Sequence, residues 1–161
     1  MTKFGLFAAF AALTLAACNR PLLERSKPTV ERASATIPSG RFRTIAAVAG
    51  GDSKTELRMS AQVRQQLTDS GFAVIRKAGR WESEQAAIRA ICAPDAVPPV
   101  DGVLFIWYNR LELRDCTTEA AAYEIGGYGD IGIMDMANRL VRYLKRGGTS
   151  EQAQPAQPTR D

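Results

Sequence analysis

The stretch TIAAVAGGDSKTELRMSAQVRQQLTDSGFAVIR, residues 44–76, decides the fold, because it encodes a strand, a helix and a second strand in succession. The segment from Thr44 to Ala49 is nearly all apolar, which predicts a strand covered on both faces. Ser53 and Glu56 have the spacing of a capping box, which predicts the start of a helix.

The predicted helix ends at Gly71, after Met59, Val63 and Leu67 have recurred at helical spacing. A second strand then follows over residues 72–76, the sequence FAVIR. Because a helix joins the two strands, we expect them to be parallel with a right-handed crossover.

The pattern continues toward the C-terminus with further strands and helices. It predicts a second helix over residues 83–93, a strand over 103–113, a turn at Arg114-Asp115, a strand over 117–125 and a last helix over 130–146. The expected fold class is therefore α/β: a small β-α-β-α-β-β-α sandwich, with a mixed four-stranded sheet and about three helices.

The N-terminus has the pattern of an export signal. Lys3 supplies a positive charge, and an apolar run over residues 4–15 follows it, too short to span a bilayer comfortably. The run closes with Leu15-Ala16-Ala17-Cys18, which resembles the lipobox of bacterial lipoproteins. That resemblance implies acylation of the Cys18 thiol with a palmitate-type chain, cleavage before Cys18 and acylation of the new amine.

The resemblance also implies a location. Asn19 follows Cys18, and under an enteric-type sorting rule the absence of Asp at this position implies the outer membrane, with the inner membrane as the less favoured alternative. The protein would then be held by its lipid on the periplasmic face, since two or more acyl chains give stable anchoring.

Composition divides the chain into four segments. We expect a signal peptide at residues 1–17, a proline-bearing flexible tether at 18–41, an α/β domain at 42–147 and a disordered Gly/Pro/Gln-rich tail at 148–161. The net charge of +4 comes largely from the tether, so the domain is close to neutral and nucleic acid is not an expected partner. The basic tether either is solvated, which we favour, or rests on anionic lipid headgroups.

Cys92 and Cys116 form an even pair in a chain expected to reach an oxidising compartment. They are therefore candidates for a disulfide that would contribute roughly 3 kcal/mol on the loop-entropy model. The alternative is that Cys92 is a small buried helix residue and Cys116 an exposed thiol.

The sequence favours a protein without catalytic activity. It contains no histidine, which removes the usual general base, the Ser-His-Asp triad and the commonest metal ligand. Two carboxylate pairs could in principle support glycoside hydrolysis, Asp95 with Asp101 and Glu112 with Glu119, but solvated acids are the simpler interpretation.

Two glycine-containing segments resemble nucleotide-binding loops, at residues 127–132 and 50–55. The first lacks a following strand with an acidic residue, and the second lacks two of the required glycines. We interpret both as turns and expect no cofactor and no metal.

Aromatic residues cluster around the predicted hairpin. Trp107 suits the core, whereas Tyr108, Tyr123 and Tyr128 are candidates for a surface that contacts a partner. An exposed edge of the hairpin could also accept a partner strand.

Residues 42–146 also resemble a family of envelope proteins. The strand GFAVIR at 71–76 and the segment VDGVL at 100–104 are similar to the α/β domain of the penicillin-binding-protein activator, curli-secretion and TolB N-terminal group. The first strand departs from that family because it ends in Gly50-Gly51 without an Asp-rich end, and the chain has no material for a curli-type barrel. The resemblance implies protein binding and scaffolding without catalysis.

The function expected from the sequence is therefore a lipid-anchored periplasmic adaptor or assembly factor that binds an envelope protein. The alternative is a small envelope enzyme, or a binding protein for sugar or peptidoglycan fragments. A cleft lined by convergent acids would favour the alternative, and a filled core with an exposed aromatic hairpin would favour the adaptor.

Overall fold

The computed structural model describes residues 30–127 and 132–146, and it contains the predicted strand-helix-strand unit. Strand β2 (Thr44–Ala49), helix α1 (Lys54–Asp69) and strand β3 (Ala73–Lys77) follow in order, with β2 and β3 parallel. Ser53 caps α1 by accepting a hydrogen bond from the Glu56 N–H. Gly71 turns the chain into β3 with φ +96°, a conformation that glycine adopts without strain.

The sheet is mixed, as predicted, but the described residues form six strands and the prediction of four is wrong. The remaining strands are β1 (Val30–Ala33), β4 (Gly102–Trp107), β5 (Arg110–Asp115) and β6 (Ala121–Gly126). Their order across the sheet is β1-β6-β5-β4-β2-β3. Strand β4 is parallel to β2, whereas the β4–β5, β5–β6 and β6–β1 pairs are antiparallel.

One extra strand arises because the predicted strand over residues 103–113 is a hairpin. Strands β4 and β5 are joined by the turn Tyr108-Asn109, and Trp107 pairs with Arg110. Apolar residues continue at Leu111 and Leu113 on the far side of the turn, so the alternation looked like one strand.

The other extra strand, β1, lies in the segment that was predicted as a tether. Its Glu31 carboxylate accepts hydrogen bonds from the Tyr123 hydroxyl (2.7 Å) and from Arg139 (2.8 Å). A 3-10 turn, η2 (Ser39–Arg41), follows β1, and Ile37 just before this turn is buried. The folded domain therefore begins no later than Val30, ahead of the boundary predicted at residue 42.

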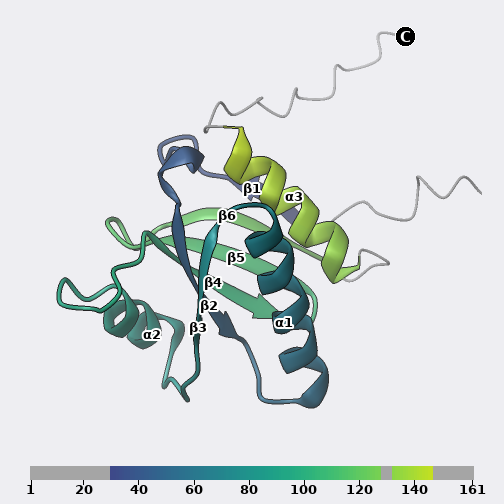
Figure 1. The fold of residues 1–161 in the computed structure, drawn as a ribbon, viewed down its shortest axis with the longest axis horizontal. Coiled ribbons are helices and arrows are strands. Elements are labelled where there is room, and N and C mark those ends of the chain that lie inside the picture. The colour runs from purple at the N-terminus through teal and green to yellow at the C-terminus, as the bar shows by residue number, and fades with distance from the viewer. Residues whose placement is uncertain (1–29, 128–131, 147–161) are drawn as a thin grey trace, which may run out of the picture.

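The two faces of the sheet are covered unequally (Figure 1). Helices α1 and α3 (Ile133–Lys145) pack side by side on one face, over the main core, and α2 (Glu84–Ile91) covers part of the other. The main core is built largely from aliphatic side chains of the strands and the two helices: Ile45, Val63, Leu67, Leu104, Ile106, Leu111, Leu113, Ile125, Met136 and Leu140. The three α-helices agree with the predicted number. The predicted tail at 148–161 lies outside the described residues.

Candidate functional site

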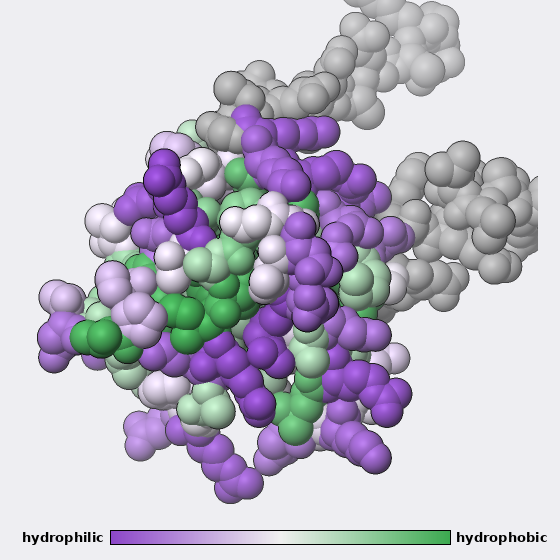
Figure 2. All heavy atoms as spheres, viewed as in Figure 1, coloured by the Kyte–Doolittle hydropathy of each residue, from purple (hydrophilic) through white to green (hydrophobic). Residues whose placement is uncertain are grey.

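A recess opens where β2 and β3 end beside the first turns of α1. Because parallel strands end at the same edge of a sheet, the loop after β2 and the loop after β3 meet there. The recess has a volume of about 430 Å³, within the range of small-ligand sites. In Figure 2 the surface between β3 and the start of α1 is mostly hydrophilic.

Most of the uncharged residues that line the recess are small. Alanine and glycine predominate, with Leu57 half-exposed beside them; the uncharged lining residues are Ala47, Ala49, Gly51, Leu57, Ser60, Ala61, Ala78 and Gly79. The short side chains leave the space that larger residues would fill.

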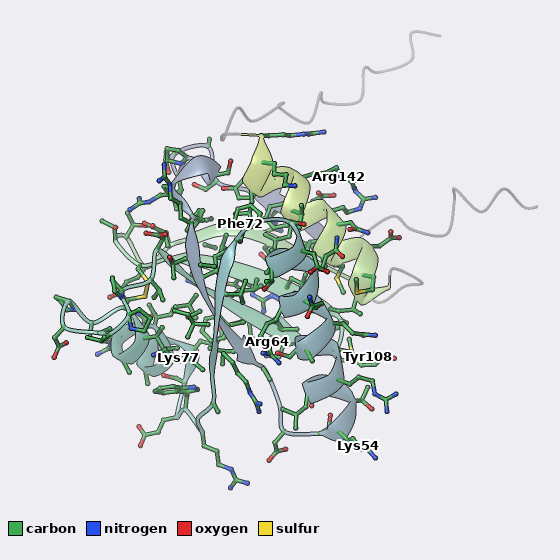
Figure 3. All side chains as sticks on the ribbon, viewed as in Figure 1. Lys54, Arg64, Phe72, Lys77, Tyr108 and Arg142 are labelled. Carbon is green, nitrogen blue, oxygen red and sulfur yellow. A yellow bond between two sulfur atoms is a disulfide. The ribbon has the colours of Figure 1, made fainter. Side chains whose placement is uncertain are left out.

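Cations dominate the charged part of the lining. Arg64 comes from α1, Arg76 and Lys77 come from β3, and Arg80 follows β3. Figure 3 shows Arg64 between α1 and β3, and Lys77 on the other side of β3, toward α2. Asp52 is the acid of the lining, and it is paired at 3.4 Å with Arg80, with both side chains largely exposed.

Arg64 is the cation that α1 contributes to the recess. Its side chain is half-buried, and its Nε atom is buried without a hydrogen-bond partner. Within residues 30–127 and 132–146, Arg64 forms no ion pair. Its two outer nitrogens are not among the buried unpaired atoms, so they are the donors that a ligand in the recess could reach.

The amino terminus of α1 contributes little to this positive character, because its first turn is already capped. The Ser53 hydroxyl contacts both the Glu56 N–H and the Glu56 carboxylate, and the Leu57 N–H donates to the Ser53 carbonyl. The Glu56 carboxylate also lies against Gly51. The excess positive charge of the recess therefore comes from side chains.

The predicted aromatic surface is only partly present. Tyr108 is 68% exposed at the β4–β5 turn, as a partner-facing residue would be. The prediction for Tyr123 is wrong: it is 3% exposed, stacks on Tyr143 and donates its hydroxyl hydrogen bond to Glu31. Tyr128 lies outside the described residues.

The predicted hairpin edge is not available to a partner strand. Strands β6 and β1 extend the sheet beyond β5, so the sheet's edges are β1 and β3. Trp107 is half-buried, with Phe105 stacked at 5.5 Å and the Arg110 guanidinium 4.9 Å above its ring. Trp107 thus packs against a smaller core between the sheet and α2, as predicted for a core residue; this core consists of Ala46, Val48, Ala87, Ile88, Ile91, Val103 and Phe105.

The predicted disulfide between Cys92 and Cys116 is confirmed, with a Cα–Cα distance of 5.2 Å. It joins the end of α2 to the residue after β5, across the less covered face of the sheet. Cys18 and the lipobox residues Leu15, Ala16 and Ala17 lie outside the described residues.

Three of the four carboxylates considered for glycoside hydrolysis have structural partners. Asp101 accepts hydrogen bonds from the backbone N–H groups of Arg43 and Thr44, both at 2.8 Å. Glu112 is 1% exposed and forms ion pairs with Arg110 and Arg114. Glu119 accepts a hydrogen bond from Gln85.

Sequence reasoning missed the recess and its four cations. Two signals pointed to them: Arg64 lies on the helix face that also carries Leu57 and Ala61, and Arg76-Lys77 with Arg80 forms a basic cluster where a strand ends. Neither signal shows that the two groups converge, since that depends on how the strands pair.

Comparisons with known proteins identify no family. No family model and no curated protein matches the chain. Among solved structures, the PelC dodecamer from Paraburkholderia phytofirmans is similar at a TM-score of 0.41 and 14% identity, over 76% of this chain and 97% of that one. Histidyl-tRNA synthetase from Nostoc sp. PCC 7120 is similar at 0.41 and 14%, over 65% of this chain and 23% of that one.

Prolyl-tRNA synthetase from Cryptosporidium parvum is similar at a TM-score of 0.43 and 9% identity, over 66% of this chain and 21% of that one. This chain thus spans less than a quarter of either synthetase. At these scores the likeness gives no ground for transferring a function. Among the helices of residues 30–127 and 132–146, none has the length and hydropathy to cross a membrane.

Proposed function

We propose that this protein is a lipid-anchored, non-catalytic adaptor or assembly factor of the cell envelope, which binds a protein partner at the recess between α1 and β3. The observation that carries the proposal is the contrast between the recess and the carboxylates. Asp101, Glu112 and Glu119 have partners within the fold, whereas the Arg64 guanidinium faces an open cavity.

Two further features support a place in the envelope. The leader ends in Leu15-Ala16-Ala17-Cys18, a lipobox-like sequence, with Asn19 next. The Cys92–Cys116 disulfide suits an oxidising compartment such as the periplasm. We therefore propose that the acylated Cys18 anchors the domain to the periplasmic face of the outer membrane.

Mass spectrometry of the mature N-terminus tests the anchor. We expect a chain that begins at Cys18 with acyl groups on its thiol and amine, and an unmodified amine there would refute it. A Cys18→Ser variant should leave the membrane fraction.

Photo-crosslinking in intact cells tests the binding role. A benzoyl-phenylalanine at Ala78, on the rim of the recess, should capture one defined envelope protein. The same group at Ala90, exposed on α2, is the matched control and should not capture it. Equal capture at both positions, or none at Ala78, would refute a partner at the recess.

A second candidate is a binding protein for sugar or peptidoglycan fragments, which the volume of the recess favours. A space of about 430 Å³ suits a small molecule as well as a protein segment. Saturation-transfer NMR with a purified muropeptide should show binding that is lost when Ala61 is replaced by Trp, which fills the recess. No transfer would leave the protein adaptor as the supported function.

A further inference from the structure

We infer that the recess recognises an oxyanion, a carboxylate or phosphate group carried by the ligand, and that Arg64 is its central contact. This inference rests on the proposed binding role of the recess and adds the chemical class of what is bound.

The first argument compares the ion-pair partners of Arg64 with those of the other half-buried arginines. Four arginines of the described residues are half-buried: Arg64, Arg110, Arg114 and Arg139. The last three all form ion pairs with glutamates, at Glu112, Glu124 or Glu31. Arg64 alone among these four has no acid. The missing partner of Arg64 is the acid that a ligand would bring.

The second argument is the cost of leaving Arg64 as it is. A half-buried guanidinium loses part of its hydration, and a buried N–H without an acceptor adds to that loss. An oxyanion at the two outer guanidinium nitrogens would offset the lost hydration, because guanidinium binds carboxylate and phosphate through two parallel hydrogen bonds. The small side chains of Ala47, Ala49 and Ala61 leave room for it.

The third argument is the charge around Arg64. Arg76, paired in register with Ala47, lies on the opposite wall, and within the described residues it forms no ion pair. Asp52, the acid of the lining, is already paired with Arg80, and the Glu56 carboxylate beside Gly51 is already bonded to Ser53. The field inside the recess therefore favours an anion.

NMR titration of the purified ¹⁵N-labelled protein tests the inference, with N-acetylglutamate and inorganic phosphate as separate probes and sodium chloride at matched ionic strength as the blank. We expect saturating shifts of the Arg64 Nε–H and of the Gly51, Ala78 and Gly79 amides. Shifts with N-acetylglutamate only would assign the site to carboxylates, and shifts with phosphate only to phosphates. No saturating shift with either, or shifts equal to those in chloride, would overturn the inference.

Two matched variants isolate Arg64. Arg64→Gln should weaken binding at least about tenfold, which is what loss of a charge-assisted hydrogen bond produces. Arg58→Gln removes an equal charge from an exposed position of the same helix outside the recess, and should bind like wild type. If both variants bound the anion equally weakly, the loss of binding would be due to net charge alone, and a specific site at Arg64 would be refuted.

The melting temperatures of wild type and Arg64→Gln, measured without added anion, test the role of Arg64 independently. If Arg64 serves a ligand, Arg64→Gln should melt at or above the wild-type temperature, whereas a structural role predicts a lower one. The titration is also separable from the cell experiment. Capture at Ala78 with a silent titration would remove the oxyanion and keep the adaptor, and the reverse would keep the anion site and remove the protein partner.

Discussion

Reduction of the Cys92–Cys116 disulfide should cost a large part of the stability of this domain. The two cysteines are 24 residues apart in sequence, and closing a loop of that length removes unfolded-state entropy worth about 3.5 kcal/mol. Small domains have only about 5–15 kcal/mol in total. The loss should concentrate at α2, because the bridge ties the end of that helix to β5 on the less covered face.

Urea unfolding of the same protein with and without dithiothreitol measures the effect without changing side-chain volume. With a slope of about 1.5 kcal/mol/M, the midpoint should fall by about 2 M on reduction. Hydrogen exchange should show α2 losing protection first. The Cys92→Ala/Cys116→Ala double variant is the control and should not respond to reductant. A fall below about 0.5 M, or an equal fall in the double variant, would refute the reasoning.

Two further predictions concern residues that hold the sheet together. Burial first, and then the hydrogen bond to Glu31, raise the pKa of Tyr123 above 10, so its contribution is present below pH 10 and lost as pH rises further. Above pH 10, the unfolding free energy of wild type should therefore fall with pH more steeply than that of Tyr123→Phe, by up to about 1.4 kcal/mol per pH unit. Urea unfolding from pH 9 to 11.5 measures this, and the same pH dependence of the unfolding free energy in both proteins would contradict it. A Cβ at Gly50 would clash with the Trp107 ring, so Gly50→Ala should lower the unfolding free energy by about 1–3 kcal/mol and change the near-UV circular dichroism of tryptophan. Gly132→Ala is the control: its Cβ meets no atom within 4 Å, so neither quantity should change.

Segments with a clear local period were predictable. The capped helix α1 and the strands on either side of it follow from apolar spacing, a capping box and Gly71, and the structure confirms them. The disulfide was predictable as a hypothesis, because two cysteines in a chain with a predicted export signal have few other uses.

Strand β1 was not predictable, because nothing in its own residues distinguishes it from a tether. The sequence VERA contains three exposed residues and no buried one. It becomes a strand because the edge of β6 offers hydrogen-bonding groups and because Tyr123 and Arg139 hold Glu31. The same contacts explain why Tyr123 is buried.

The sequence by itself determined the βαβ unit and the α/β class, since each depends on neighbours along the chain. It made Cys92 and Cys116 a candidate pair, because Cys18 was assigned to the lipobox, and the structure decided that they are bridged. Only the tertiary structure decided the sheet order, the place of β1 and the basic recess. Arg64 and Arg76 lie on separate elements, and they face one cavity because β2 and β3 pair in parallel and α1 crosses back over them. Such convergence is set by which strands become neighbours, a non-local choice that no local period encodes.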